Sequence, residues 1–414
     1  MNPEERKSHV ASDKRMLYLN YLSIVFFLAY GMVALDASSV SYVSDVMIRE
    51  LGITVAQYSV LSASIWLTKA LSSIVIGIIA DKTGKRKLFL SPLLICAGMT
   101  SLLASASNSF WLLLICRFLC GCCIGASLSM MVSIIKKNLV KDDFGARSGF
   151  VSCGSAVLCS TLGPMILTAI VLKWSWRGAF CFTGLMLLLL GLLMQFTVRE
   201  VEYPVVRKTG SQSGGNVLKA LFTNRVFVLC LVIGIFETAG KMSLTIFGPV
   251  YLTEICGLDT KMKGAVLSAM GLVYIPATLI IPALADRFRA TKVMAVTFFL
   301  CVITPAAMLF LQGSRTSVIS YVVFGNLAAA TVSIFIYLLP ARALPPELTG
   351  TANGIIMGAS VFFGGFVCPV LLGRIAGTDS GLMVMAGICI AMFMVCGILS
   401  LVIDGKNKRR VMNE

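Results

Sequence analysis

The chain has 414 residues, of which 57% are hydrophobic and 13% charged, and its formal net charge is +16 at pH 7. A soluble domain of this size has too little interior to hide so much apolar surface, so the composition excludes an ordinary soluble protein. The basic residues lie mostly in short segments between apolar runs, which argues against nucleic-acid binding and for a membrane protein whose charges set its topology.

Apolar runs of about 20 residues follow one another along the chain, each long enough to cross a hydrocarbon core of about 30 Å. The predicted spans of the first half are 17–36, 57–80, 88–107, 110–135, 150–172 and 178–197. Those of the second half are 226–252, 264–285, 293–312, 318–339, 354–375 and 382–403. The polar start of the chain and the full length of the first run indicate a membrane span and not a cleavable signal.

The positions of Lys and Arg predict the orientation. With a cytoplasmic N-terminus, the inner segments contain most of the basic residues, and the outer ones keep only Arg49, Lys173, Arg177, Lys261, Lys263, Arg315 and Arg374. This positive-inside bias predicts a multi-pass protein of the cell (inner or plasma) membrane with both termini in the cytoplasm.

Cysteine and histidine give little support to metal or redox chemistry. Nearly all of the 14 cysteines lie within predicted spans, so no disulfide framework is implied. Cys116, Cys120, Cys122 and Cys123 cluster on the fourth span, where close packing of small residues is a simpler interpretation than a metal site. We expect no metal and no cofactor. The single histidine, His9, lies in the polar tail, so proton chemistry would have to use carboxylates.

The sequence repeats itself at an offset of 205 residues. A polar linker, 201–220, separates a predicted N-terminal six-helix bundle, 1–200, from a C-terminal one, 221–414. A duplicated membrane domain is typical of a transporter that works by alternating access. Glycine and proline bend helices, so the fifth and eleventh spans are predicted to bend. The matching pairs are Asp81 and Asp286, Gly149 and Gly354, and Pro164 and Pro369.

The loop after the second span, 77-GIIADKTGKRK-87, places an acid and a turn glycine before a basic cluster. It resembles the loop between helices 2 and 3 of the major facilitator superfamily, with the pattern G-x-x-x-D-R/K-x-G-R/K-R/K. Two further segments resemble motifs of that superfamily: R-x-x-x-G-x-x-x-G at 117–125 and W-R-x-x-F at 176–180. The resemblance covers almost the whole chain. It implies an all-α membrane protein of two pseudo-symmetric six-helix bundles that transports a solute and is not an enzyme.

By this resemblance the charged loop is a gate on the cytoplasmic side. Asp81 would contact the positively polarised N-terminus of helix 11, and Arg86 would lock that contact. The predicted gating residues are Gly77, Asp81, Gly84 and Arg86, with Asp286 and Arg287 from the degenerate second copy.

Ionisable side chains within spans are functional candidates, because each costs about 2.5–3.5 kcal/mol at the bilayer centre. Arg117 must be paired, and Asp36 is its predicted partner. An anion competing for Arg117 would make Asp36 easier to protonate, which couples anion to proton. The alternatives are a structural arginine and a helix-capping aspartate.

Three more charged residues lie within spans. Lys69, near the middle of the second span, is predicted to contact substrate or to form a structural pair. Glu237 and Lys241, one helical turn apart, either neutralise each other or supply a second proton site and a second substrate cation. The five charges sum to one excess positive charge, which favours an anionic substrate. Tyr274, Asn326 and Tyr337 are candidates for polar substrate contacts, with ordinary packing as the alternative.

The region from Leu35 to Trp66 resembles the anion:cation symporter family, which carries organic anions with protons. The chain departs from it at Ala37, where that family has arginine, at Ile124, where it has glutamate, and at Lys69, where an aromatic residue is common. We therefore expect proton-coupled symport of a small organic anion such as a carboxylate. The alternative is a drug or metabolite antiporter, although the glycine pair of its helix-5 signature is missing after Pro164. The expected partners are a small-molecule substrate, protons and the lipid bilayer, with no nucleic acid, and the expected state is a monomer.

Overall fold

A computed structural model describes the backbone of residues 3–83, 85–139, 143–199, 214–378 and 380–411. Its side chains are described for 15–80, 83, 85–139, 143–144, 146–199, 218–345, 348–378 and 380–403. Within these ranges the chain is helical and forms no strand. It divides into two compact units, called unit 1 (Met1–Ser39 and Thr68–Arg207) and unit 2 (Val40–Leu67 and Lys208–Glu414).

The helices of the first half are α1 (Pro3–Tyr42), α2 (Ser44–Leu51), α3 (Val55–Thr83), α4 (Arg86–Ser105), α5 (Phe110–Ile124), α6 (Ser127–Asn138), α7 (Phe144–Gly154), the π-helix η1 (Ser155–Leu162), α8 (Gly163–Trp174) and α9 (Trp176–Thr197). The C-terminal end of α1 and the N-terminal part of α3, together with α2, belong to unit 2.

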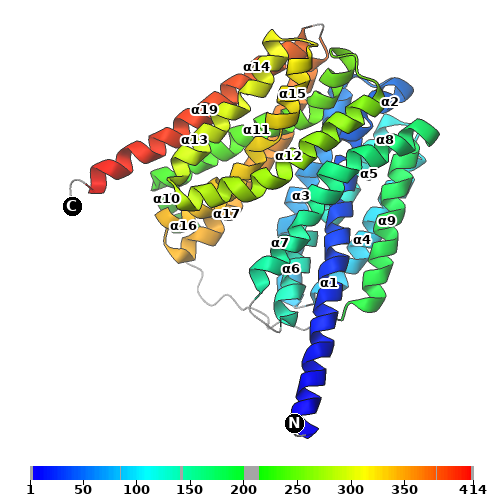
Figure 1. Cartoon of the computed structure of the whole chain (residues 1–414), viewed down its shortest axis with the longest axis vertical. Helices are drawn as coiled ribbons and strands as arrows, with labels where there is room; N and C mark the ends of the chain where they lie inside the picture. Colours follow the sequence, from blue (N-terminus) through cyan, green and yellow to red (C-terminus); the bar gives the residue numbers. More distant parts are fainter. Residues whose placement is uncertain (1–2, 84, 140–142, 200–213, 379, 412–414) are drawn as a thin grey trace. The chain divides into compact units, whose positions relative to one another are not determined.

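The second half contains α10 (Gly214–Thr223), α11 (Arg225–Glu254), α12 (Thr260–Arg287), α13 (Ala290–Cys301), α14 (Ile303–Phe310), α15 (Arg315–Phe324), the 3-10 helix η2 (Leu327–Thr331), the π-helix η3 (Ile334–Leu338), α16 (Leu339–Ala343), α17 (Pro346–Ala359), the π-helix η4 (Ser360–Val367), α18 (Cys368–Ala376) and α19 (Gly381–Val411). Within unit 2, α19 runs beside α13 (Figure 1).

Twelve helical segments of the described chain are long and apolar enough to cross a membrane, which confirms the predicted all-α membrane fold. They are Arg15–Tyr42, Val55–Ala80, Arg86–Ser105, Phe110–Asn138, Ala146–Trp174, Trp176–Thr197, Arg225–Glu254, Thr260–Arg287, Ala290–Phe310, Arg315–Ala343, Leu348–Ala376 and Gly381–Ile403, called spans 1 to 12 below. The six-helix division at the linker stays a prediction.

The 205-residue repeat reappears in the helix boundaries. Span 4 begins at 110 and ends at 138, and span 10 begins at 315 and ends at 343, so both ends differ by 205. The π-helices η1 and η4 run over 155–162 and 360–367, which again differ by 205 at both ends. The duplication therefore extends to a rare backbone conformation in the middle of spans 5 and 11.

A proline explains where these π-helices end. Pro164 follows η1 and Pro369 follows η4, each at the second position of the next helix. Proline has no amide hydrogen, and its ring clashes with the carbonyl one turn earlier, so an ordinary α-helical turn cannot precede it without distortion. The wider π turn accommodates the ring, and π segments in helices are frequent at functional sites. The prolines that predicted bends in spans 5 and 11 therefore follow directly after π-helical backbone.

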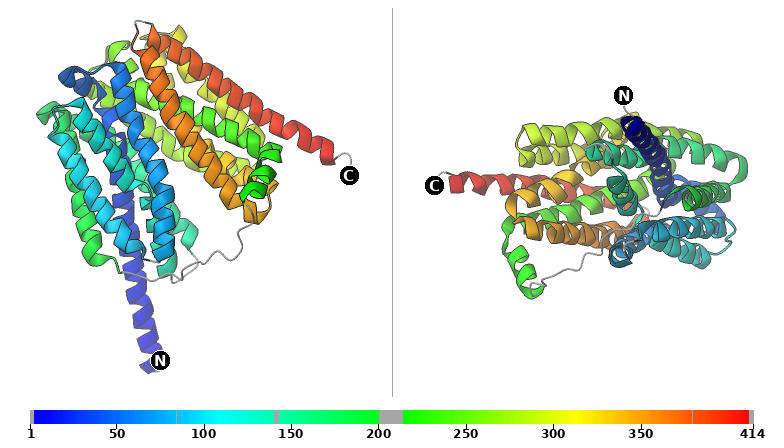
Figure 2. Two further views of the ribbon diagram at one scale, coloured as in Figure 1. Left: turned by 180° about the vertical axis from the view of Figure 1, so that it is seen from behind. Right: turned by 90° about the horizontal axis from the view of Figure 1, so that it is seen from below.

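Glycines let the helices of unit 1 approach closely. A side-chain carbon added at Gly98 of α4 would lie 2.7 Å from the carbonyl oxygen of Gly184 on α9, and one at Gly184 would lie 2.9 Å from that of Gly98. The left view of Figure 2 shows α4 (cyan) and α9 (green) side by side. Such small-residue contacts replace the hydrophobic driving force that helices lack in a lipid solvent.

The π-helices take part in similar contacts. In unit 1, a side-chain carbon at Gly154, just before η1, would lie 2.2 Å from the carbonyl oxygen of Phe27 on α1. In unit 2, one at Gly364 of η4 would lie 2.4 Å from the carbonyl oxygen of Ile235 on α11. Span 5 therefore packs on span 1 as span 11 packs on span 7.

Candidate functional site

The predicted pair of Asp36 and Arg117 is present in the interior of unit 1. Both residues are completely buried, on α1 and α5 respectively. Arg117 Nη1 lies 3.1 Å from Asp36 Oδ2, and Arg117 Nη2 donates to the main-chain carbonyl of Asp36 at 2.6 Å. An unpaired charge would be very costly in this interior, and the pairing offsets that cost for both residues.

Three further donors reach the Asp36 carboxylate from neighbouring helices. Ser101 of α4 and Thr183 of α9 each donate to Oδ1 at 2.7 Å, and the thiol of Cys120 on α5 lies 3.2 Å from Oδ2. Asp36 thus joins four helices of unit 1. The position inside α1, six residues before its end, excludes the simple outer helix cap that was the alternative interpretation.

The W-R-x-x-F motif packs against this pair. Phe180, the last residue of W-R-x-x-F, places its ring 5.3 Å from the Arg117 guanidinium carbon, within the range of a cation–π contact. Trp176, one turn earlier, meets Phe180 edge-on. Among the described residues, Arg117 Nε has no acceptor, so one donor of this buried group remains unused.

Lys69 lies on α3, in the same unit and far from both ends of span 2. Its side chain is partly exposed. The glycines of the R-x-x-x-G-x-x-x-G motif at 117–125 determine how closely α3 approaches α5. Ser72 donates to the carbonyl of Gly121 at 3.2 Å, and a carbon added at Gly125 would lie 2.4 Å from the carbonyl oxygen of Lys69. The R-x-x-x-G-x-x-x-G pattern therefore positions the backbone that carries Lys69.

Glu237 and Lys241 form the second predicted pair, on α11 in unit 2. Lys241 Nζ lies 3.1 Å from Glu237 Oε1, and Thr238 donates to Oε2 at 3.0 Å. The Glu237 side chain is fully buried, whereas that of Lys241 keeps 14% of its surface exposed. This pair therefore has an accessible cation, which the Asp36–Arg117 pair lacks.

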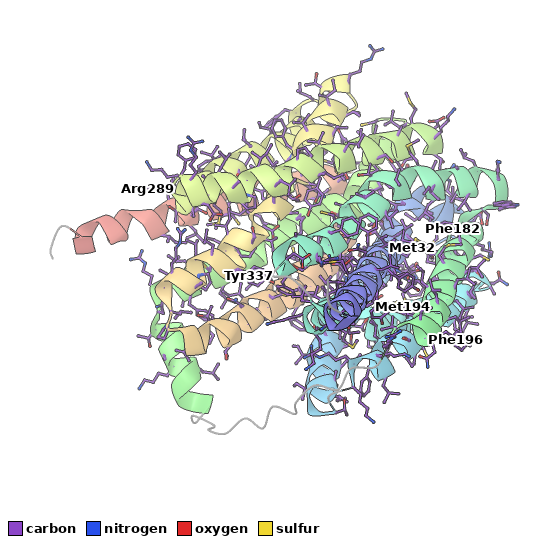
Figure 3. The ribbon with its side chains drawn as sticks, turned by 60° about the horizontal axis from the view of Figure 1, so that its bottom comes forward. Met32, Phe182, Met194, Phe196, Arg289 and Tyr337 are labelled. Atoms are coloured by element: carbon purple, nitrogen blue, oxygen red, sulfur yellow. The ribbon has the colours of Figure 1, made fainter. Side chains whose placement is uncertain are left out.

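The other candidate residues of unit 2 differ in exposure. Tyr274 on α12 and Asn326 before η2 are half-buried, while Tyr337 of η3 is 52% exposed. Figure 3 labels Tyr337 on this irregular segment. Irregular backbone within a span is tolerated where it is buried in protein or lines a cavity, so η2 and η3 mark span 10 as a functional candidate.

The predicted gating residues are described only in part. Gly84 and the side chain of Asp81 lie outside the described residues. Gly77 is in α3 and Arg86 opens α4, both partly exposed. Asp286 and Arg287, at the end of α12, are exposed. Their roles in gating stay a prediction.

A third buried ion pair was missed by sequence reasoning. Lys263, which hydropathy places among the outer charges, is completely buried in α12 and bonds to Asp45 of α2, both within unit 2. Thr260 also donates to Asp45, at 2.6 Å. Burial alone would raise the pKa of Asp45, but the charge and hydrogen bonds of Lys263, with smaller contributions from Thr260 and a backbone amide, outweigh it and hold that pKa below its ordinary value.

Twelve membrane-crossing helices in a duplicated arrangement, with buried acid–base pairs, define a secondary transporter. The chain matches the model of the Major Facilitator Superfamily over residues 26–369 and belongs to that superfamily. It is a multi-pass membrane transporter and not an enzyme.

Several characterised proteins are similar along most of their length. The sialic acid transporter NanX of Escherichia coli (strain K12) is 23% identical, covering 91% of this chain and 89% of that one. The multidrug resistance protein MdtL of Klebsiella pneumoniae (strain 342) is 25% identical (86% and 87%). The alpha-ketoglutarate permease of E. coli (strain K12) is 23% identical (72% and 73%). Among solved structures, a D-xylose-proton symporter shares the fold with a TM-score of 0.70 at 14% identity, covering 92% of this chain and 97% of that one.

Proposed function

We propose that the protein is a proton-coupled symporter of a small organic anion, such as a carboxylate, in the cell membrane, with both termini in the cytoplasm. The observation that carries the proposal is the set of charges within the spans. Asp36 and Glu237, the buried carboxylates of spans 1 and 7, are each paired with a cation, and Lys69 adds a further positive charge, so these five charges sum to +1; the buried pair of Asp45 and Lys263 adds nothing to this sum. A monovalent anion would neutralise this excess.

The pairs suggest how anion and proton are coupled. A nearby cation disfavours protonation of a carboxylate, and an anion that occupies the cation removes this effect. Lys241 is the more accessible of the two paired cations, so an anion reaching it would free Glu237 to accept a proton. Arg117 is closed off in this structure, so the same exchange at Asp36 requires a conformational change that admits the anion.

Two relatives support an anionic substrate, because one is named for sialic acid and another for alpha-ketoglutarate, both carboxylic acids. We assign Lys69, Arg117 and Lys241 to substrate charge and Asp36 and Glu237 to protons. Tyr274, Asn326 and Tyr337 would supply polar contacts, and the loop at 77–87 with Asp286 and Arg287 would gate access. The proposed state is a monomer.

Proton-driven efflux of drugs is the second candidate, favoured by the 25% identity to the multidrug resistance protein MdtL. An exporter of lipophilic cations is expected to expose acids to its substrate. In the described spans, Asp36 and Glu237 are instead fully buried against basic partners. The charge arrangement therefore favours the anion.

The test uses proteoliposomes containing the pure protein, with an inside-alkaline pH gradient. Labelled sialic acid or 2-oxoglutarate is supplied outside, or labelled tetraphenylphosphonium is loaded inside, each with and without a protonophore. We expect one of the acids to accumulate above equilibrium, and the protonophore to abolish this. Gradient-dependent extrusion of the phosphonium with no uptake of either acid would contradict the proposal.

A further inference from the structure

A long apolar groove runs along unit 2 between α12 and α13, with a volume of about 780 Å³. The α12 residues that line it recur at the spacing of one helix face, from Pro276 to Leu284, the connection after α12 contributes Phe288 and Arg289, and α13 contributes residues from Lys292 to Leu300. Several of these side chains are largely exposed, among them Phe288 at 60% and Val296 at 58%. The groove is therefore open along its length.

The groove has one charged end. Arg289 and Lys292 line it where α12 passes into α13, and the rest of its lining is apolar apart from Thr297. Thr297 bonds back to the carbonyl of Val293 in its own helix, at 2.8 Å. Figure 3 labels Arg289 at this end of the unit. Asp286, the acid next to this end, is exposed and is not among the lining residues.

The length of the groove corresponds to one leaflet of a bilayer. Twelve residues of α12 separate Pro276 from Phe288, or about 18 Å at the helical rise, and half of a hydrocarbon core is about 15 Å. The deep end includes Leu327 of η2, close to the middle of span 10. The two cations then lie at the level of the headgroups, on the side that the distribution of Lys and Arg predicts to be cytoplasmic.

We propose that this groove is a binding site for one anionic phospholipid, with an acyl chain between α12 and α13 and the phosphate group on Arg289 and Lys292. The complementarity of charge selects this occupant. A neutral apolar ligand would not use the cations, and a protein helix would place apolar or neutral groups against them. Basic pockets at the ends of membrane helices are suited to anionic headgroups. The site is independent of the transported substrate.

The test needs a fluorescent reporter in the groove. All four tryptophans (Trp66, Trp111, Trp174 and Trp176) lie outside α12 and α13, so one added to α13 is the only tryptophan in these two helices. We would compare Val296→Trp, in the groove, with Leu279→Trp, which is 65% exposed on α12 outside the lining. The protein is reconstituted into phosphatidylcholine with a series of mole fractions of either brominated phosphatidylglycerol or brominated phosphatidylcholine, and quenching in protein without the reporter is subtracted.

Phosphatidylglycerol is expected to quench the Val296→Trp reporter with an apparent affinity roughly 30-fold above that of phosphatidylcholine, the size expected for two cations at a headgroup. The preference should disappear when Arg289→Gln and Lys292→Gln are combined. The preference for phosphatidylglycerol should remain when Lys219→Gln and Arg225→Gln are combined, because they remove two positive charges from exposed positions of unit 2 outside the groove. The Leu279→Trp reporter should show no preference.

Equal quenching by the two lipids, or a preference that survives Arg289→Gln with Lys292→Gln, would overturn the proposal. Failure of both lipids to quench Val296→Trp, with Leu279→Trp quenched normally, would also overturn it, because protein would then cover the groove. Native mass spectrometry on the protein without reporters checks that the added indole does not block the site. One phosphatidylglycerol should remain bound, and the charge-neutralised protein should lose it.

Discussion

Arg117 holds Asp36 in two different ways, through its carboxylate and through its main chain. The ion pair spans 3.1 Å, while Nη2 donates to the carbonyl oxygen of Asp36 at 2.6 Å and to that of Ala37 at 3.3 Å. The main-chain bonds do not depend on the protonation of the carboxylate. The main-chain bonds would therefore keep the arginine anchored in a variant whose side chain at position 36 is neutral.

This relationship predicts the behaviour of Asp36→Asn. The variant should fold and exchange labelled for unlabelled substrate across proteoliposomes, but it should lose accumulation driven by a pH gradient. Ser101→Ala is the matched control, because it removes one 2.7 Å hydrogen bond from the carboxylate and keeps the titrating group. That control should keep accumulation. Full pH-driven accumulation by Asp36→Asn would remove Asp36 from the coupling mechanism.

Lys69→Gln should weaken substrate binding. Loss of one charge-assisted contact is expected to cost about 1.5–3 kcal/mol, or roughly 10-fold to 100-fold in affinity. Lys69→Arg keeps the charge and should retain most of the substrate affinity. Thermal stabilisation of the purified protein by substrate gives the affinity without transport. Equal affinity in the wild type and Lys69→Gln would show that Lys69 is structural.

The buried pair of unit 2 predicts a large effect on stability. Lys263→Met should lower the free energy of unfolding by about 3–5 kcal/mol, because Asp45 would lose its buried partner and keep only the largely exposed Arg49, 3.7 Å away, as a counter-charge. Asp45→Asn with Lys263→Met removes both charges and should recover part of the loss. Thermal unfolding in detergent compares the three proteins. A Lys263→Met protein as stable as the wild type would contradict this account of the pair.

The same pair predicts a pH dependence of stability. Since the pKa of Asp45 is lower in the folded state, its contribution is fully present above the ordinary aspartate value of about 3.9 and is lost as the pH falls through the folded value. The melting temperature of the wild type should therefore fall below about pH 4 more steeply than that of the doubly neutralised protein. Parallel curves of melting temperature against pH for the two proteins would show that Asp45 does not contribute to the pH dependence.

Two glycines of α7 provide a test of the close packing between span 1 and span 5. A methyl group at Gly154 would lie 2.2 Å from the Phe27 carbonyl oxygen, whereas Gly149 has open space around it. Gly154→Ala is expected to destabilise the protein by about 1–3 kcal/mol. Gly149→Ala should be neutral or slightly stabilising, since alanine favours a helix. Equal melting temperatures for the two variants would contradict the packing described here.

Local patterns were sufficient to predict the helices and the repeat. Apolar runs and a 205-residue offset determine spans 4 and 10, whose observed ends obey that offset. Pro164 and Pro369 marked the bends, because the missing amide of proline is a local property. The π-helical backbone before each proline could not be predicted, because composition does not specify which hydrogen-bond pattern the preceding turns adopt.

Long-range partners were only partly predictable. The pairing of Asp36 with Arg117 followed from the cost of an unpaired charge in a membrane. The hydroxyls of Ser101 and Thr183 could not be singled out, because Ser and Thr are common in spans and most bond to their own helix. The burial of Lys263 was missed for a related reason: it depends on Asp45, more than 200 residues earlier, and not on the neighbouring sequence.

Internal pH in proteoliposomes tests the central claim most directly. Vesicles containing the pure protein and a pH-sensitive dye are challenged externally with sialic acid, 2-oxoglutarate and then tetraphenylphosphonium, without an imposed gradient. Anion–proton symport predicts protein-dependent acidification by one of the acids, which Arg117→Ala should abolish. Alkalinisation by the phosphonium, with no response to either acid, would contradict symport and support antiport.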